Sequence, residues 1–391
     1  MFVVVLLLGQ TATILRPYPQ ASPRAKPKEL PNPSLPAMIK PFRFYPCRVL
    51  RLYRGGSGIG SLCGSPHPAD SRFPESWIAS CIEGNGRAYH SRGHGLSLID
   101  YEGTPHLFAG FLHEHAEDCL GAEHLAAFGE TPAVLTKLLD SAEQLPMQVH
   151  PTREDARRHF HADYGKTEAW LVLSTREIDG VEPYLLVGFS PTLNRETFMR
   201  ECLDGEFHEG LGMCNRLAVK AGDVIVIRGG LPHAIGPGVT MVEVMEPSDL
   251  VIVPERNCCG VELSEAQRFA GLSPETALGL FDYTPRTPEQ VRELCTPRRQ
   301  TLARTETGLL ESLIPHEAVS GYFAVERLTF TGSWQLDLTR RSFRIGVVTE
   351  GELALGDLRL KRGDSFFLPH CLEECRLTGA ATVMFILPPR P

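Results

Sequence analysis

The sequence lacks the cysteine spacings that stabilise disulfide-rich or zinc-ribbon folds. Its 391 residues contain 11 cysteines, an odd number, and no two of them form a Cys-x-x-Cys pair. A disulfide framework is unusual in a chain of this length, and a structural zinc ribbon needs cysteines paired at that spacing. We therefore expect reduced thiols that pack as small hydrophobic side chains, and a cytoplasmic protein.

The start of the chain lacks both a membrane span and a standard secretory signal. The apolar run in residues 1–9 has about half of the roughly 20 residues that a transmembrane helix needs. No Lys or Arg precedes it, as one would in a signal peptide. The residues up to 36 are rich in Pro, Ser and Lys, and a second Met stands at position 38. We expect residues 1–37 to be a disordered extension or a misassigned start; a poor signal peptide is the alternative.

Positive charge is in deficit. The 39 Lys and Arg against 47 Asp and Glu give a formal net charge of −8, which argues against nucleic acid or an anionic membrane as the partner. A hydrophobic fraction of 42% is that of a globular protein, and the length suggests two or three domains. The 14 histidines leave metal chemistry open.

Two segments before residue 145 have clear local patterns. Residues 50–60 (LRLYRGGSGIG) predict a strand followed by a glycine turn. A turn is favoured over a phosphate cradle, because neither the P-loop nor the GxGxxG fingerprint is present. Residues 130–142 have apolar residues at helical spacing and predict a short surface helix.

From residue 145 to 253 short β-rich runs alternate with Gly and Pro turns, as in an antiparallel sandwich or barrel. The expected strands are 169–173, 184–187, 223–227 and 240–244. A helical insertion is expected at 153–160. Residues 264–294 are also predicted to be helical, because their Ser-Pro-Glu and Thr-Pro-Glu runs place Pro at a first helical position.

Strand patterns return after His316, at 322–330, 343–348 and 352–355. The run KRGD (361–364) before a buried strand repeats the earlier KAGD (220–223), and two barrels built on one plan give such an internal echo. We therefore predict a mainly β fold of two β-barrels joined by a short helical connector. The predicted boundaries are a catalytic domain at 38–255, the connector at 256–315 and a C-terminal barrel at 316–391.

Three short motifs in the first predicted barrel carry candidate metal ligands. QVH (148–150) and KTE (166–168) each place two side chains on one face of a strand, because side chains alternate along it. PH (232–233) follows the next strand across a Gly-Gly turn. The candidate ligands are Gln148, His150, Glu168 and His233. If the three strands are neighbours, two imidazoles, one carboxylate and one amide oxygen converge, a set that suits a divalent metal such as zinc with one position open.

These blocks resemble the signature segments of class I mannose-6-phosphate isomerases, which belong to the cupin superfamily. The matching segments are QVHP (148–151), GKTEAW (165–170) and GD…PHAIG (222–236), with further likeness at 72–80 (RFPESWIAS) and 241–249. The resemblance covers roughly residues 47 to 391. It implies cupin-type jelly-roll barrels and one Zn²⁺ in the first barrel, held by the four candidate ligands. It also implies interconversion of mannose 6-phosphate and fructose 6-phosphate through a cis-enediol.

The resemblance also implies roles for residues around the metal. Lys166 matches an active-site lysine, and Asp249 matches an acidic position near the substrate. Valine stands at position 253, where the family usually has arginine, and Arg256 lies three residues further on as a candidate replacement. Lys166 is two residues from a ligand on the same strand face, which suits charge stabilisation or proton relay. The alternative is that Lys166 is a cation at the rim of the barrel that only pairs with Glu168.

Three functions are compatible with the sequence. The leading one is the isomerase, acting on a phosphorylated hexose and feeding mannose metabolism. The others are a metal-dependent cupin oxidoreductase and a non-catalytic or substrate-shifted sugar-phosphate-binding cupin, which Val253 favours. The side chains of Arg48, Arg51 and Arg54 either hold the phosphate or face solvent. The run HEH (113–115) is expected on the surface, and the second barrel is expected to hold no metal, because no paired HxH precedes its Pro-His.

Overall fold

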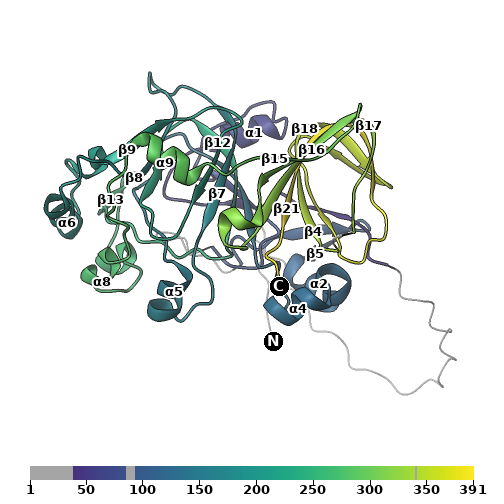
Figure 1. Ribbon diagram of the computed structural model, residues 1–391, viewed down its shortest axis with the longest axis horizontal. Helices are drawn as coiled ribbons and strands as arrows, with labels where there is room; N and C mark the ends of the chain where they lie inside the picture. The colour runs from purple at the N-terminus through teal and green to yellow at the C-terminus, as the bar shows by residue number, and fades with distance from the viewer. Residues whose placement is uncertain (1–37, 85–92, 340) are drawn as a thin grey trace, which may run out of the picture. The chain divides into compact units, whose positions relative to one another are not determined.

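The structure, a computed structural model, describes residues 38–84, 93–339 and 341–391 (Figure 1). The predicted extension at 1–37 lies outside the described residues. Residues 38–391 form one unit. Strands dominate it, so the prediction of a mainly β fold is confirmed.

The first large sheet carries the sequence motifs and has six strands. In spatial order they are β10 (Val224–Ile227), β7 (Glu168–Thr175), β12 (Val239–Met245), β6 (Leu135–Asp140), β3 (Glu75–Ile78) and β2 (Arg48–Val49). A three-stranded sheet holds β11 (His233–Ile235), β8 (Tyr184–Phe189) and β9 (Cys214–Ala218). All neighbouring strands in both sheets are antiparallel.

The two sheets share a hydrophobic cluster, so they pack face to face. Trp170 and Ile225 of the six-stranded sheet lie in the same buried cluster as Leu185 and Leu217 of the three-stranded sheet. Residues on one face of each strand thus point into a common interior because side chains alternate. The motif residues lie at the ends of these strands, beside that interior.

The second large sheet has ten strands and is built from both ends of the described chain. Its path is β15 (Gln300–Arg304), β16 (Gly308–Ile314), β17 (Ala324–Gln335), β21 (Arg376–Leu387), β18 (Arg344–Leu355), β20 (Ser365–Leu368), β1 (Phe42–Phe44), β4 (Leu98–Tyr101) and β5 (Thr104–Leu107), with β19 (Leu358–Lys361) paired to β18. Strands from residues 42–107 therefore complete the C-terminal sheet. Two strands, β15 and β16, come from the segment predicted as a helical connector.

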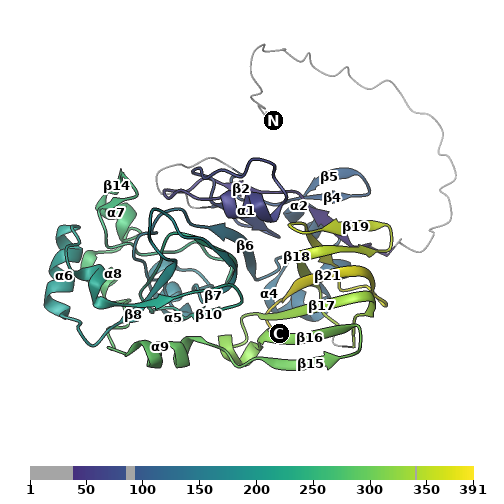
Figure 2. The same ribbon diagram turned by 90° about the horizontal axis from the view of Figure 1, so that it is seen from above.

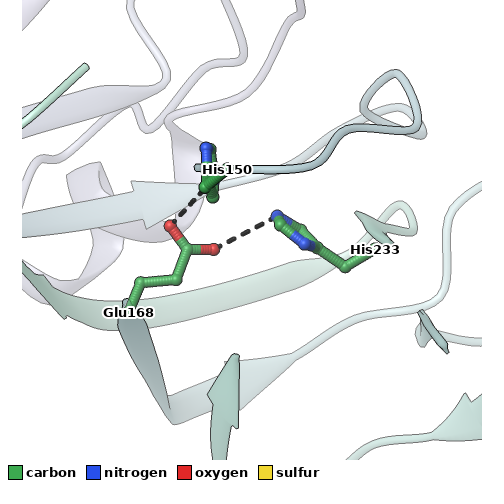
Figure 3. Close-up of side chains that lie close together, drawn as sticks. All are labelled: His150, Glu168 and His233. Atoms are coloured by element: carbon green, nitrogen blue, oxygen red, sulfur yellow. Dashed lines mark ion pairs between the residues drawn. The ribbon is translucent and has the colours of Figure 1, made fainter. Parts of the chain in front are cut away.

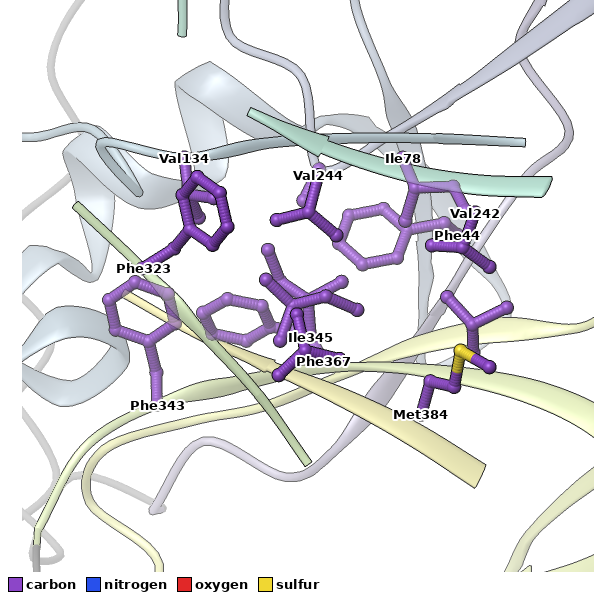
Figure 4. Packing of buried hydrophobic residues seen from close by; sticks show 14 of the residues in the cluster. Phe44, Ile78, Val134, Val242, Val244, Phe323, Phe343, Ile345, Phe367 and Met384 are labelled. Atoms are coloured by element: carbon purple, nitrogen blue, oxygen red, sulfur yellow. The ribbon is translucent and has the colours of Figure 1, made fainter. Parts of the chain in front are cut away.

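The two large sheets lie side by side, as Figures 1 and 2 show for the teal and the yellow strands. Figure 4 shows the hydrophobic cluster between them, with Val242 and Val244 of β12 facing Ile345 of β18 and Phe367 of β20. The rings of Phe42 and Phe367 stack at 5.1 Å between centroids. Each large side chain buried here contributes roughly 1.5–3 kcal/mol of hydrophobic stabilisation, so the cluster joins the sheets into one body.

Helices occupy the connections. Before β6 they are α1 (Ser57–Leu62), α2 (Phe108–Glu114), α3 (Ala116–Leu120) and α4 (Ala122–Phe128). After it come α5 (Arg153–Asp155) with the π-helical turn η1 (Ala156–Phe160), α6 (Arg195–Asp204), η2 (Gly210–Met213), α7 (Glu265–Arg268), α8 (Pro274–Leu278), α9 (Pro288–Cys295) and η3 (His316–Val319). A small hairpin, β13 (Asn257–Cys258) and β14 (Val261–Glu262), precedes α7. No helix of the described residues is long and apolar enough to cross a membrane.

The predicted helix starts are confirmed at α8 and α9. Each has Pro as its first helical residue, after a Ser or Thr whose hydroxyl accepts a hydrogen bond from the backbone of the third helical residue. The insertion at 153–160 is confirmed as α5 and η1. The strands predicted at 343–348 and 352–355 form one continuous strand, β18.

The internal echo between the two KxGD runs is a repeated turn. In Lys220–Asp223 and in Lys361–Asp364, the lysine N–H donates to the aspartate carboxylate at 3.0 Å. The aspartate N–H donates back to the lysine carbonyl, at 3.1 and 2.9 Å respectively. The glycine of each run has a positive φ, 89° and 91°, which favours glycine there. The sequence repeat therefore encodes one turn geometry used twice.

The helix predicted at 130–142 is wrong. Residues Leu135–Asp140 form β6, a strand buried at every position and paired on both sides, to β12 and β3. A central strand covered on both faces has a nearly continuous apolar run, and such a run also fits helical spacing. Lys137, which a surface helix would expose, is buried inside the sheet structure.

The strand and turn predicted at 50–60 are also corrected. Strand β2 ends at Val49, and the glycine run leads into α1. The carboxylate of Asp140 accepts hydrogen bonds from the backbone N–H groups of Gly56 (2.6 Å) and Gly58 (3.1 Å). A Cβ at Gly55 would come within 1.8 Å of the Asp140 carbonyl oxygen, so the close approach requires glycine. The glycines therefore pack around a carboxylate of the chain itself.

Candidate metal centre

Three of the four candidate ligands meet at one point (Figure 3). His150, Glu168 and His233 offer one ligand atom each, and these atoms lie within 4.8 Å of one another. Glu168 is the first residue of β7 and His233 the first of β11, while His150 follows the Gln148–His233 bridge between the chain segments. Strands β7 and β11 belong to different sheets, so the ligands converge across the interior and not along one sheet.

Both histidines present an unprotonated nitrogen to the carboxylate. The Nδ1 of His150 is 2.8 Å from the carbonyl oxygen of Leu250, and the Nδ1 of His233 is 2.8 Å from that of Leu231. A carbonyl oxygen only accepts, so each Nδ1 carries the proton, and each Nε2 has a lone pair. Burial, then the charge of Lys166, lowers the pKa of His150 to about 3, and burial lowers the pKa of His233. Both rings are therefore neutral.

The remaining polar atoms fit a cation. The Nε2 atoms of both histidines lie 3.3 Å from the oxygens of Glu168, and neither group has a proton to share. Within the described residues, Oε1 of Glu168 and Nε2 of His233 are buried without a hydrogen bond, and Oε2 of Glu168 has the Lys166 ammonium beside it. Electron-rich atoms that face each other in a buried site repel unless a positive charge lies among them. Two imidazole nitrogens and one carboxylate are a typical ligand set of a catalytic zinc site.

Lys166 brings a positive charge to this group. Its Nζ lies 2.8 Å from Oε2 of Glu168 and 3.0 Å from Nε2 of His150. Burial alone would lower the pKa of Lys166, but the nearby carboxylates, Glu168 first, raise it above its usual value. Burial alone would raise the pKa of Glu168, whereas the charge of Lys166 holds it well below its usual range. An ammonium ion and a carboxylate therefore face each other here.

A cavity opens beside the clustered residues, and three of the seven predicted site residues line it. Gln148, Lys166 and Asp249 line it, and so does Val253, which is buried. Arg256 does not line it: its guanidinium donates to the backbone carbonyl of Asp204, at the end of α6. The structure thus brings together every predicted site residue except Arg256.

The cavity also holds charged residues that the sequence motifs did not mark. Lys137 of β6 lies 3.5 Å from Glu75 of β3 and 3.3 Å from Glu243 of β12, and all three are buried. Arg51 lies against Asp249 and Glu75. The signal that would have found Lys137 is its position: a lone charge inside the apolar run of a strand covered on both faces.

The other candidate motifs do not form sites. His113 is exposed and pairs with Glu130 at 2.7 Å, as expected for a surface run. Among the described residues, His150, Glu168 and His233 are the one group of histidines, cysteines and acids that could hold a metal. Arg48 donates to the backbone carbonyl of Phe73, and the 11 cysteines form no disulfide within the described residues.

The chain is similar in sequence to curated mannose-6-phosphate isomerases. The chain is 28% identical over 271 residues to the mannose-6-phosphate isomerase ManA of Bacillus subtilis, and the alignment covers 65% of this chain and 74% of the relative. It is 28% identical over 312 residues to the mannose-6-phosphate isomerase of Streptococcus mutans, and that alignment covers 77% of this chain and 87% of the relative. No family model matches the chain.

Solved structures share the fold. The mannose 6-phosphate isomerase of Bacillus subtilis superposes with a TM-score of 0.66 at 21% identity, over 88% of this chain and 99% of that one. A zinc-bound mannose 6-phosphate isomerase superposes with a TM-score of 0.64 at 15% identity, over 90% of this chain and 100% of that one. The resemblance to the class I isomerases that the motifs predicted is therefore confirmed.

Proposed function

We propose that this chain is a metal-dependent mannose-6-phosphate isomerase that interconverts mannose 6-phosphate and fructose 6-phosphate. The observation that carries the proposal is the buried group of His150, Glu168 and His233 beside Lys166, at the edge of a cavity. The two curated relatives, which are named for this activity, support it. The oxidoreductase and the non-catalytic alternatives have no such support.

The metal would be held by His150, Glu168 and His233, with Gln148 as the fourth ligand. Two observations support this role for Gln148: it lines the cavity, and its backbone pairs with that of His233. We assign one Zn²⁺ per chain because the neutral imidazoles and the carboxylate match its preference. When bound, the ion supplies Lewis-acid stabilisation of oxygen atoms that become negative. The two sheets around the centre are proposed to form a cupin-type jelly-roll barrel, with a second one in the C-terminal sheet.

The chain's own residues would manage charge and protons in the cavity. The isomerisation removes the proton at C2 and returns it at C1, while a proton moves from the O2 hydroxyl to O1. Lys166 is placed to donate a hydrogen bond from its ammonium group to an oxygen that gains negative charge, since it lines the cavity beside Glu168. Asp249, on the same cavity, is placed to accept hydrogen bonds from sugar hydroxyls.

A coupled assay tests the activity. Purified protein loaded with zinc is given mannose 6-phosphate, and the fructose 6-phosphate formed is detected through a coupled dehydrogenase. We expect turnover that a His233→Ala variant lacks, because one of three clustered ligands is removed. Equal rates for both proteins would contradict the isomerase proposal. Oxygen consumption restored by iron and not by zinc would favour the oxidoreductase.

A second experiment separates the lysine from the metal. We expect Lys166→Met to keep its zinc, measured as metal per chain after gel filtration, and to lose at least about 100-fold in kcat. The reason is that the lysine supplies a cation at the reacting oxygens but is absent from the proposed ligand set. Retained activity would make Lys166 a rim cation that only balances Glu168.

A further inference from the structure

Arg51 is the one arginine among the described residues that line the cavity. Its Nη1 and Nη2 lie 3.2 and 3.3 Å from the two carboxylate oxygens of Asp249. Its Nε lies 2.9 Å from Oε1 of Glu75. The side chains of Arg51 and Asp249 are each 12% exposed, so the pair is nearly buried. This is a two-point contact, which fixes the plane of the carboxylate as well as its distance.

The surroundings of Arg51 hold the guanidinium in place. The guanidinium carbon lies 5.1 Å from the centre of the Trp77 ring. Glu75, its second partner, is itself held by hydrogen bonds of 2.7 Å from the Tyr53 hydroxyl and from the Trp77 indole. A side chain fixed by packing and by a fixed partner loses little entropy when it holds a third group.

The contacts of Arg51 argue against a phosphate site. All three nitrogens of its guanidinium face the carboxylates of Asp249 and Glu75. A phosphate would have to displace one of these carboxylates from its donors. The guanidinium therefore acts on the carboxylates and not on the anionic end of the substrate.

We propose that Arg51 is a positioning residue that holds Asp249 ionised and in one orientation at the cavity, where the carboxylate receives the sugar. The proposal rests on the isomerase function. It is specific to this chain's arrangement, because position 253, on the same cavity, is a buried valine with no charge to offer Asp249. Burial would raise the pKa of Asp249, and Arg51 is the main group that lowers it below its usual range.

A double-mutant cycle tests this role. Arg51→Gln, Asp249→Asn and the double variant are compared with wild type in the zinc-loaded coupled assay. We expect Arg51→Gln to lower kcat by roughly 100-fold, the typical loss when a reacting group is misplaced by about 1 Å. The double variant should lose no more than Asp249→Asn alone, because Arg51 acts through Asp249. Arg51→Lys should fall between wild type and Arg51→Gln, since it restores the charge without the two-point contact.

Inhibition by inorganic phosphate separates positioning from phosphate binding. The Ki of phosphate should stay within twofold of wild type in Arg51→Gln. A tenfold higher Ki with kcat unchanged would overturn the proposal and make Arg51 a phosphate ligand. Multiplicative losses in the double variant, or an unchanged kcat in Arg51→Gln, would overturn it as well.

A matched control is Arg344→Gln. Arg344 is a buried arginine 3.0 Å from Glu326 in the C-terminal sheet, away from the cavity, and its loss should leave kcat unchanged. If Arg51→Gln does not fold, as judged by thermal unfolding, Arg51→Lys takes its place in the cycle.

The result also separates this proposal from the proposed function. A wild-type protein that binds fructose 6-phosphate in calorimetry without turnover would contradict the isomerase alone. The same four proteins are then compared by their affinity for fructose 6-phosphate. If the two substitutions weaken binding independently of each other, the positioning role is overturned. Absence of both binding and turnover would overturn both proposals.

Discussion

At the scale of single residues, the histidines of the candidate metal centre are oriented by the backbone. The Nδ1 protons of His150 and His233 are each fixed by a carbonyl oxygen, which leaves both Nε2 lone pairs toward Glu168. Backbone partners of this kind set the tautomer before any ion arrives. Glu168 is then the one negative group among the three clustered ligands, and it should determine how tightly a dication binds.

We predict that Glu168→Gln weakens zinc binding by at least about 100-fold, more than the loss of an outer-shell partner typically causes. The amide keeps the size of the side chain but removes the charge that attracts the ion. Zinc affinity is measured by competition with a chromogenic chelator. Glu311→Gln, a change at a carboxylate paired with Arg327 outside the cavity, is the control and should bind zinc as wild type does. An unchanged affinity in Glu168→Gln would place the metal elsewhere.

At the scale of elements, one row of side chains crosses the six-stranded sheet beside the cavity. Trp77 of β3 pairs with Lys137 of β6, Lys137 with Glu243 of β12, and Glu243 with Trp170 of β7. The Lys137 ammonium lies 4.7 Å from the centre of the Trp77 ring, and the Trp170 indole donates to Glu243 at 3.3 Å. Register alone therefore places two charges between two tryptophans.

This row predicts a large cost for removing the lysine. Lys137→Met leaves Glu75 and Glu243 buried with one cation fewer, and we expect a loss of about 3–5 kcal/mol in the free energy of unfolding. Urea denaturation measures it. Adding Glu243→Gln should recover part of the loss, while Lys220→Met, at an exposed turn, should change stability by less than about 0.5 kcal/mol. A change under about 1 kcal/mol in Lys137→Met would show that water reaches the row.

The same element shows what the sequence could not reveal. The motif residues were recognisable because their spacing matches strand periodicity and known signatures. By contrast, β6 was predicted as a helix, since an apolar run covered on both faces fits both periods. Lys137 and Glu75 were missed, and Arg51 was named only as a phosphate ligand or a solvent-facing residue, because the three come from separate segments that only the folded sheet brings together. Arg256 was proposed from its distance along the chain, and the chain turns it toward α6.

At the scale of the whole molecule, one partly buried acid should shape the pH dependence of stability. Burial raises the pKa of Glu255 from its ordinary value of 4.5 to about 7. Its carboxylate accepts a hydrogen bond of 2.5 Å from the Met147 N–H. Because its pKa is higher in the folded state, the protonated form favours folding. That stability is fully present below pH 4.5 and is lost as pH rises through 7.

We predict that Glu255→Gln removes this loss. The amide oxygen still accepts the hydrogen bond but does not ionise. The difference between variant and wild type in unfolding free energy should therefore grow by up to about 3 kcal/mol between pH 5 and pH 8, in favour of the variant. Chemical denaturation at each pH, with zinc held constant, measures it. A difference that stays constant with pH would mean that Glu255 ionises freely in the folded protein.

The pairing of β1 with β20 has a consequence for biosynthesis. Phe42 lies opposite Phe367, so these partners are 367 − 42 = 325 residues apart along the chain. Translation at about 5–20 residues per second separates their emergence from the ribosome by roughly 16 to 65 s. During that interval β1 can pair with β4 on one edge, but its other edge lacks β20. The C-terminal sheet must therefore close after synthesis is nearly complete. Chaperones that shield nascent apolar segments must cover those at the start of the folded unit for the longest time.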